Sequence, residues 1–88
     1  MMTKIMVQNL SPHTTEESLS VLFEKFGAVQ SVSLATDIMT GRCGGIGFVQ
    51  LEEQNSGAAL YSLDGKCVGG RVLCVTVEKK RALHSYLS

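Results

Sequence analysis

The chain is 88 residues long, which is enough for one hydrophobic core and too short for a large multi-layer enzyme fold. Apolar residues make up 44% and charged residues 18% of the chain, a composition typical of a globular domain. Eight basic residues balance eight acidic ones, and this net charge of zero argues against strong non-specific binding of nucleic acid. No apolar run approaches the ~20 residues of a membrane span, and no signal-peptide cleavage site follows the start. We therefore expect no membrane partner.

The cysteines and histidines predict neither a metal site nor a disulfide. Cys43, Cys67 and Cys74 are odd in number and form no C-x-x-C pair, so free thiols in a reducing compartment are expected. His13 and His84 stand alone and far apart in the sequence. The chain is accordingly expected to need no metal ion and no other cofactor.

The first part of the chain predicts a strand followed by a helix. Residues 4–9 alternate between two faces, which is typical of a strand, before Ser11-Pro12-His13 interrupts the pattern. Thr14 and Glu17 together predict a capping box at the start of a helix over about residues 15–26. The predicted apolar stripe of this helix comprises Leu19, Leu22, Phe23 and Phe26, with Gly27 as the stop.

The remainder alternates between strand and helix patterns. Thr40-Gly41 is the turn signal of the loop between two strands, and Ala58, Ala59 and Leu63 are expected to attach a second helix to the core. The predicted elements are, in order, strand 29–36, loop 37–44, strand 45–51, helix 52–63, hairpin arm and turn 66–70, and strand 71–77.

The order βαββαβ predicts an α+β sandwich of the ferredoxin-like type. Two crossovers of the usual hand would place both helices on one face of a four-stranded antiparallel sheet. We expect a single domain over residues 1–80. A short tail over residues 81–88 follows it and could form a helical turn. The other face of the sheet stays open and collects Lys4, Met6, Gln8, Ser31, Ser33, Ile46, Phe48, Gln50, Cys74 and Thr76.

Two segments resemble the signature sequences of the RNA recognition motif (RRM) family. Residues 5–10, IMVQNL, resemble its first-strand signature, and residues 44–51, GGIGFVQL, resemble its third-strand signature. Residues 37–42, 63–65 and 70–73 resemble further landmarks in the same order. The resemblance runs from about Lys4 to Val77, nearly the whole chain.

The resemblance implies that the open sheet face binds single-stranded RNA, whose bases stack on aromatic side chains. The three usual stacking positions are Met6, Ile46 and Phe48, of which only Phe48 is aromatic. Because each base–aromatic stack contributes roughly 1–3 kcal/mol, we expect a modest affinity. The other candidates for RNA contact on this face are Lys4, Gln8, Gln50 and Thr76.

Basic residues outside the strands are candidates for phosphate contacts. These are Arg42, in the loop between two strands, and Lys79, Lys80 and Arg81 after the last strand, unless this terminal run is only solvated. In the tail, Leu83, Tyr86 and Leu87 are spaced i, i+3, i+4. The tail could cover the sheet face, add Tyr86 as a stacking ring, dock on a second copy of the chain, or fray.

Two other classes of function remain open at this point. The apolar, aromatic-poor sheet face or the helical face could instead grip another protein, since exposed apolar patches mark interaction sites. Catalysis is not expected: acylphosphatase-like domains of this order need an arginine after the first strand and metal chaperones a C-x-x-C, and both are absent. The resemblance to small single-domain RNA-binding proteins of bacteria implies a cytoplasmic location, or a nuclear one for a piece of a eukaryotic protein.

Overall fold

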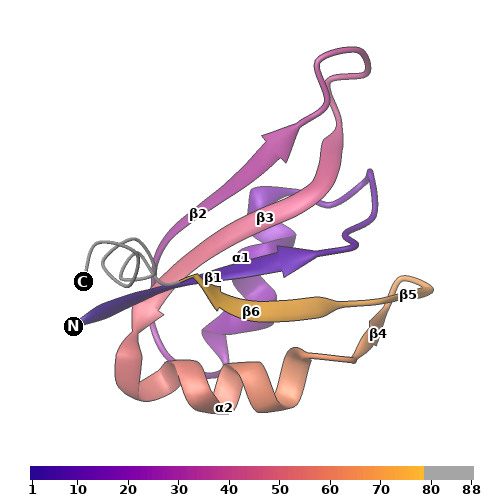
Figure 1. Ribbon diagram of the computed structural model, residues 1–88. Helices are drawn as coiled ribbons and strands as arrows, with labels where there is room; N and C mark the ends of the chain where they lie inside the picture. The colour runs from indigo at the N-terminus through magenta and orange to yellow at the C-terminus, as the bar shows by residue number, and fades with distance from the viewer. Residues whose placement is uncertain (79–88) are drawn as a thin grey trace, which may run out of the picture.

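The computed structural model describes residues 1–78. Four strands form one antiparallel sheet in the order β2-β3-β1-β6, and β4 and β5 pair as a separate short hairpin. Both helices lie on the same side of the sheet (Figure 1), which confirms the predicted ferredoxin-like α+β sandwich. The elements are β1 (Met2–Gln8), α1 (Glu16–Glu24), β2 (Val29–Thr36), β3 (Cys43–Glu52), α2 (Glu53–Leu63), β4 (Cys67–Val68), β5 (Arg71–Val72) and β6 (Cys74–Glu78).

The hydrophobic core lies between the two helices and the inner face of the sheet. Ile5 and Val7 of β1 are fully buried, and so are Val49 and Leu51 of β3. The helices contribute the buried side chains Leu19, Phe23, Ala59 and Leu63. Because successive strand residues point to opposite faces, this burial pattern places the intervening residues on the outer face of the sheet.

Helix α1 begins one residue later than the sequence predicted. Its N-cap is Thr15, whose hydroxyl accepts a hydrogen bond from the Ser18 backbone N–H (3.0 Å), while Ser18 Oγ accepts one from the Thr15 N–H (3.0 Å). The prediction of a Thr14–Glu17 box was therefore wrong. Thr14 belongs to the preceding turn, where its backbone N–H donates to the carbonyl of Ser11 (3.0 Å), and the capping box is shifted by one residue.

Helix α2 follows the expected bounds closely but buries a different residue. Ala59 and Leu63 face the core as predicted, whereas Ala58 is exposed and Ser56 is buried. Ser56 Oγ donates to the carbonyl of Glu53 (2.7 Å), which satisfies the hydroxyl in the interior. Within residues 1–78, neither helix is long and apolar enough to cross a membrane.

The last predicted strand, 71–77, is divided in two. Residues 71–72 pair with β4, whereas residues 74–78 pair with β1. The buried Leu73 separates them: its N–H donates to the carbonyl of Lys66 (2.9 Å) and its carbonyl accepts from the N–H of Gly65 (2.8 Å). Asp64 Oδ1 accepts a further hydrogen bond from the Val75 N–H (2.9 Å), so the end of α2 is tied to the start of β6.

Candidate functional site

The antiparallel register arranges the outer face of the sheet in three rows of side chains. Neighbouring rows are two residues apart along each strand, a separation of about 7 Å. The middle row contains Ser33, Phe48, Met6 and Thr76, in order across β2, β3, β1 and β6. The row on one side contains Ser31, Gln50, Lys4 and Glu78, and the row on the other side contains Ile46, Gln8 and Cys74.

Phe48 is at the centre of this face, because it belongs to the middle row and to a central strand. Its ring is partly exposed, unlike those of its buried neighbours Val49 and Leu51. Met6 lies directly opposite Phe48 on β1, and Ile46 is two residues earlier on β3; both are also partly exposed. The three predicted stacking positions thus form one accessible patch with a single aromatic ring.

Lys4 reaches from the neighbouring row over the ring of Phe48. Its Nζ lies 5.0 Å from the ring centroid, within the range of a cation–π interaction. The same Nζ lies 3.7 Å from Oε1 of Glu78. Sequence reasoning missed Glu78 because it ended the last strand at Val77; continuing the alternation of Cys74 and Thr76 by one residue would have placed it on this face.

Polar groups on the outer rows remain available to a ligand. Ser31 Oγ donates to Oε1 of Gln50 (2.9 Å), which leaves the amide NH₂ of Gln50 free as a donor. Gln8 and Thr76 form no side-chain hydrogen bond with another residue in the described part of the chain. Amides and hydroxyls of this kind can donate to and accept from the edges of nucleic acid bases.

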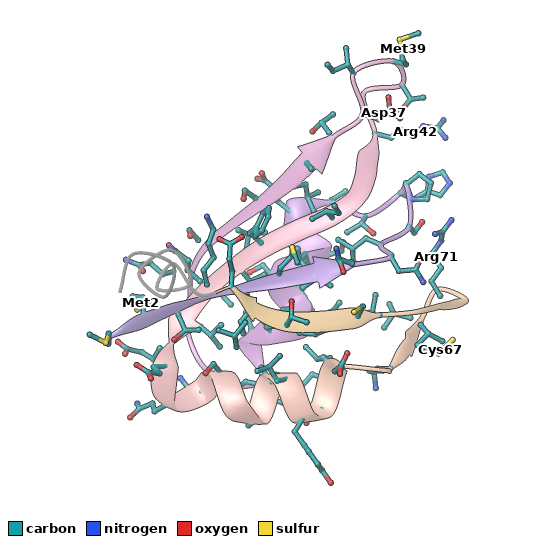
Figure 2. The ribbon with its side chains drawn as sticks, in the orientation of Figure 1. Met2, Asp37, Met39, Arg42, Cys67 and Arg71 are labelled. Carbon is teal, nitrogen blue, oxygen red and sulfur yellow. The ribbon has the colours of Figure 1, made fainter. Side chains whose placement is uncertain are left out.

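The basic residues predicted to contact phosphate are not all brought to this face. Arg42 lies apart from the three rows, in the loop between β2 and β3 at one end of the sheet (Figure 2). Lys79, Lys80 and Arg81 lie outside the described residues, as do the tail positions Leu83, Tyr86 and Leu87.

The residues that could ligate a metal ion are scattered. Within residues 1–78, no three His, Cys, Asp or Glu side chains gather in a metal-binding arrangement. The three cysteines are free thiols: Cys43 is buried, and Cys67 and Cys74 are exposed.

Comparisons with known proteins bear on the family of the chain. The elav protein of Drosophila melanogaster is 42% identical over 79 residues, which cover 89% of this chain but only 16% of elav. A putative RNA-binding protein of Nostoc sp., RbpE, is 42% identical over 78 residues, covering 88% of this chain and 79% of RbpE. Among solved structures, the Sxl-lethal protein/RNA complex has a TM-score of 0.81 at 28% identity, covering 88% of this chain and 47% of that one.

The matched region covers most of the fold and the centre of the outer face. A family model described as RNA recognition motif matches residues 5–73, a range that includes most of β1, both helices, β2 and all of β3. Phe48, Met6 and Ile46 fall within it. The chain therefore belongs to the RNA recognition motif family.

Proposed function

We propose that the protein binds single-stranded RNA through the outer face of its sheet, with one base stacked on Phe48. The observation that carries this proposal is the middle row, where a partly exposed ring lies on a central strand between rows of hydrogen-bonding side chains. Unpaired bases are recognised by such stacking combined with hydrogen bonds to their edges. Family membership and the RNA complex of the Sxl-lethal protein support the same class of ligand.

An incoming base must either share the ring of Phe48 with the ammonium group of Lys4 or displace that group from the ring. A cation–π contact at an exposed site contributes about 0.5–1 kcal/mol, whereas a base stacked on an aromatic ring contributes about 1–3 kcal/mol. Displacement of the ammonium group by a base is therefore favourable. Once displaced, Lys4 is close enough to the stacked nucleotide to pair with its phosphate.

The proposed affinity is modest because Met6 and Ile46 replace two rings. Two missing stacks remove up to roughly 2–6 kcal/mol, part of which the apolar contacts of Met6 and Ile46 restore. Met6 is the better substitute, since a thioether packs well against an aromatic face.

Phosphate contacts are assigned to Lys4 and Arg42 and, beyond the described residues, to Lys79, Lys80 and Arg81. If two to four of them engage, the plot of log K against log salt should have a slope of about −1.4 to −2.8. The proposed role is binding, and it includes no catalytic step.

The test is a titration of the isotopically labelled protein with a pool of random tetranucleotide RNAs, in which binding is monitored through NMR chemical shifts. We expect shifts at the outward positions of β1 and β3. Phe48→Ala should weaken RNA binding by about 1–3 kcal/mol, since it removes one stack, and should leave the melting temperature close to that of the wild type.

Phe23→Ala is the matched control, because the same substitution at a fully buried ring should cost about 3–5 kcal/mol of stability. A loss of stability in Phe48→Ala comparable to that in Phe23→Ala would contradict the placement of the Phe48 ring. Unchanged RNA affinity in Phe48→Ala would contradict its stacking role.

A second candidate function is favoured by the hydrocarbon character of the same patch. Met6, Ile46 and Phe48 are adjacent and partly exposed, as in surfaces that bind an apolar segment of another protein or a second copy of the chain. The titration separates the two functions: an absence of shifts at millimolar RNA would favour protein binding. Concentration-dependent shifts at the same residues without RNA would identify a second copy as the occupant.

A further inference from the structure

Strand β2 forms one edge of the four-stranded sheet. Its neighbour on one side is β3, and within residues 1–78 no strand pairs with its other side. Figure 1 shows β2 at one margin of the sheet and β6 at the other. Unpaired backbone N–H and C=O groups along such an edge are a template on which another strand can pair. At eight residues, β2 is the longer of the two edges, since β6 has five.

The edge of β2 lacks the charged side chains and the proline by which proteins commonly prevent such pairing. The sequence of β2, VQSVSLAT, contains neither, and the first charged residues on either side of it are Lys25 and Asp37. The register with β3 is irregular at Gln30 and at Ala35, which blunts the two ends of the strand. The regular stretch between them, residues 31–34, is therefore the unprotected part of the edge.

The apolar side chains of this stretch are covered less completely than those of the central strands. Val32 and Leu34 pack against the core, but both remain partly exposed. Val49, directly opposite Val32 on β3, is fully buried. The difference follows from position, because a central strand has a neighbour on each side and an edge strand has only one. A further strand beside β2 would cover Val32 and Leu34 more fully.

A second copy of the chain suits this edge. Antiparallel pairing of β2 with itself relates the two copies by a two-fold axis, and residues opposite each other must then point to the same face of the sheet. A register centred on Ser33 meets this condition: the outward Ser33 lies opposite itself, and the inward Val32 of each copy lies opposite the inward Leu34 of the other. The chain has a net charge of zero, so the two copies do not repel each other as a whole.

We propose that two copies of the protein associate by antiparallel pairing of their β2 strands, centred on Ser33, into one continuous sheet with the helices of both copies on the same side. A single pair of strands buries less than the ~800 Å² per partner of a standard interface, so the dimer should be weak, with a dissociation constant of about 0.1 mM. Because Phe48 lies opposite Ser33 on β3, the two Phe48 rings would share one row of the outer face, three strand spacings or about 14 Å apart. This consequence for RNA rests on the proposed function of the outer face, whereas the association itself needs no RNA.

The experiment is analytical ultracentrifugation of the full chain without RNA, over protein concentrations from about 0.01 to about 1 mM. The average mass should rise from that of a monomer towards that of a dimer. Ser33→Lys and Ser33→Glu should each weaken the association about tenfold or more, because like charges then lie directly opposite each other, and an equimolar mixture of the two variants should restore it. Thr76→Lys is the matched control: it adds the same charge at the exposed residue that ends the same row on β6, and it should dimerise as the wild type does.

NMR spectra of the wild type over the same concentrations locate the contact without any substitution. We expect β2 to show concentration-dependent shifts and slower amide exchange as the dimer forms. A wild type that stays monomeric, Ser33 variants that dimerise as it does, a mixture that does not associate, or an equal loss in Thr76→Lys would each overturn the proposal. Shifts at Met6, Ile46 and Phe48 in place of β2 would overturn it in favour of association through the outer face. Amides of β2 that are protected equally at every concentration would mean that the chain's own terminal segment covers the edge, which also overturns it.

Discussion

At the scale of single residues, Lys4 lies between two partners on the outer face of the sheet. Its ammonium group faces the ring of Phe48 and the carboxylate of Glu78 together. An exposed ion pair of this kind contributes only about 0.2–1 kcal/mol, so neither contact fixes Lys4 against a competing phosphate. Glu78, by contrast, places a negative charge where a phosphate would approach.

Glu78→Gln should therefore raise RNA affinity. The substitution keeps the shape of the side chain, removes its repulsion of phosphate and frees Lys4, for a gain of about 0.2–1 kcal/mol, or up to roughly fivefold at low salt. Fluorescence anisotropy with a labelled RNA measures the change. Glu17→Gln, on the exposed side of α1, is the control and should have no effect. Weaker binding in Glu78→Gln would mean that the carboxylate positions Lys4 for RNA.

Asn9 is the non-glycine residue in the described chain with a left-handed backbone. Asn9→Gly and Asn9→Ala both remove the hydrogen bonds to Arg71 and Val72, but only alanine has a Cβ that resists positive φ. We expect Asn9→Ala to be less stable than Asn9→Gly by about 1 kcal/mol in urea unfolding. Equal stability of the two variants would show that the backbone relaxes at this position.

At the scale of elements, the closeness of α1 to β3 depends on a glycine. Gly47 is buried on the inner face of β3, and a Cβ there would lie 2.7 Å from Cδ2 of Leu19 and 2.9 Å from Cδ2 of Leu34. Contacts this short force side chains in a packed interior to move. A Cβ at the inward position before Phe48 therefore fits only if the side chains of Leu19 and Leu34 shift.

Gly47→Ala should destabilise the protein by about 1–3 kcal/mol, the usual cost of overpacking a core. Gly57→Ala is the matched control, because Gly57 is exposed in α2 and an added Cβ meets nothing within 4 Å. Alanine is the better helix former, so this variant should be more stable than the wild type by about 0.5–1 kcal/mol. Chemical denaturation of both variants checks the two signs, and a stable Gly47→Ala variant would refute the tight helix–strand contact.

At the scale of the whole molecule, the layers separate the helices from the binding surface. The helices cover the inner face of the sheet, so the outer face is the one that a ligand or the terminal segment of the chain can approach. The strand β6 ends at Glu78 on that outer face, and residues 79–88 follow it. The sequence of this segment, with Leu83, Tyr86 and Leu87, remains the basis for expecting it to regulate access.

Truncation after Arg81 tests this expectation. If the tail only covers the sheet face, its few side chains contribute about 1–2 kcal/mol, and truncation should raise RNA affinity about tenfold. If Tyr86 instead stacks on a base, truncation should weaken binding, and Tyr86→Ala in the full chain should weaken it as much. Equal affinities of the full and truncated chains would contradict both versions.

The sequence alone predicted which residues point outward, and the structure confirms it for Lys4, Met6 and Phe48. The reason is that alternation along a strand is a local property, set by the backbone itself. The same locality explains the errors: a capping box shifted by one residue at Thr15, and a last strand divided at the buried Leu73. The hydrogen bond from the Thr14 N–H to the Ser11 carbonyl keeps Thr14 in the turn before the helix, and the one from the Leu73 N–H to the Lys66 carbonyl interrupts the last strand.

Only the tertiary structure decided which outward residues meet. The strand order β2-β3-β1-β6 places Met6 opposite Phe48 and brings Glu78 to Lys4, although these pairs are far apart in the sequence. The same folding brings Arg42, in the β2–β3 loop, and Arg71, in β5, to the lining of one cavity at the end of the sheet. Pairings of this kind depend on the packing of the whole chain around one core, and no local pattern records them.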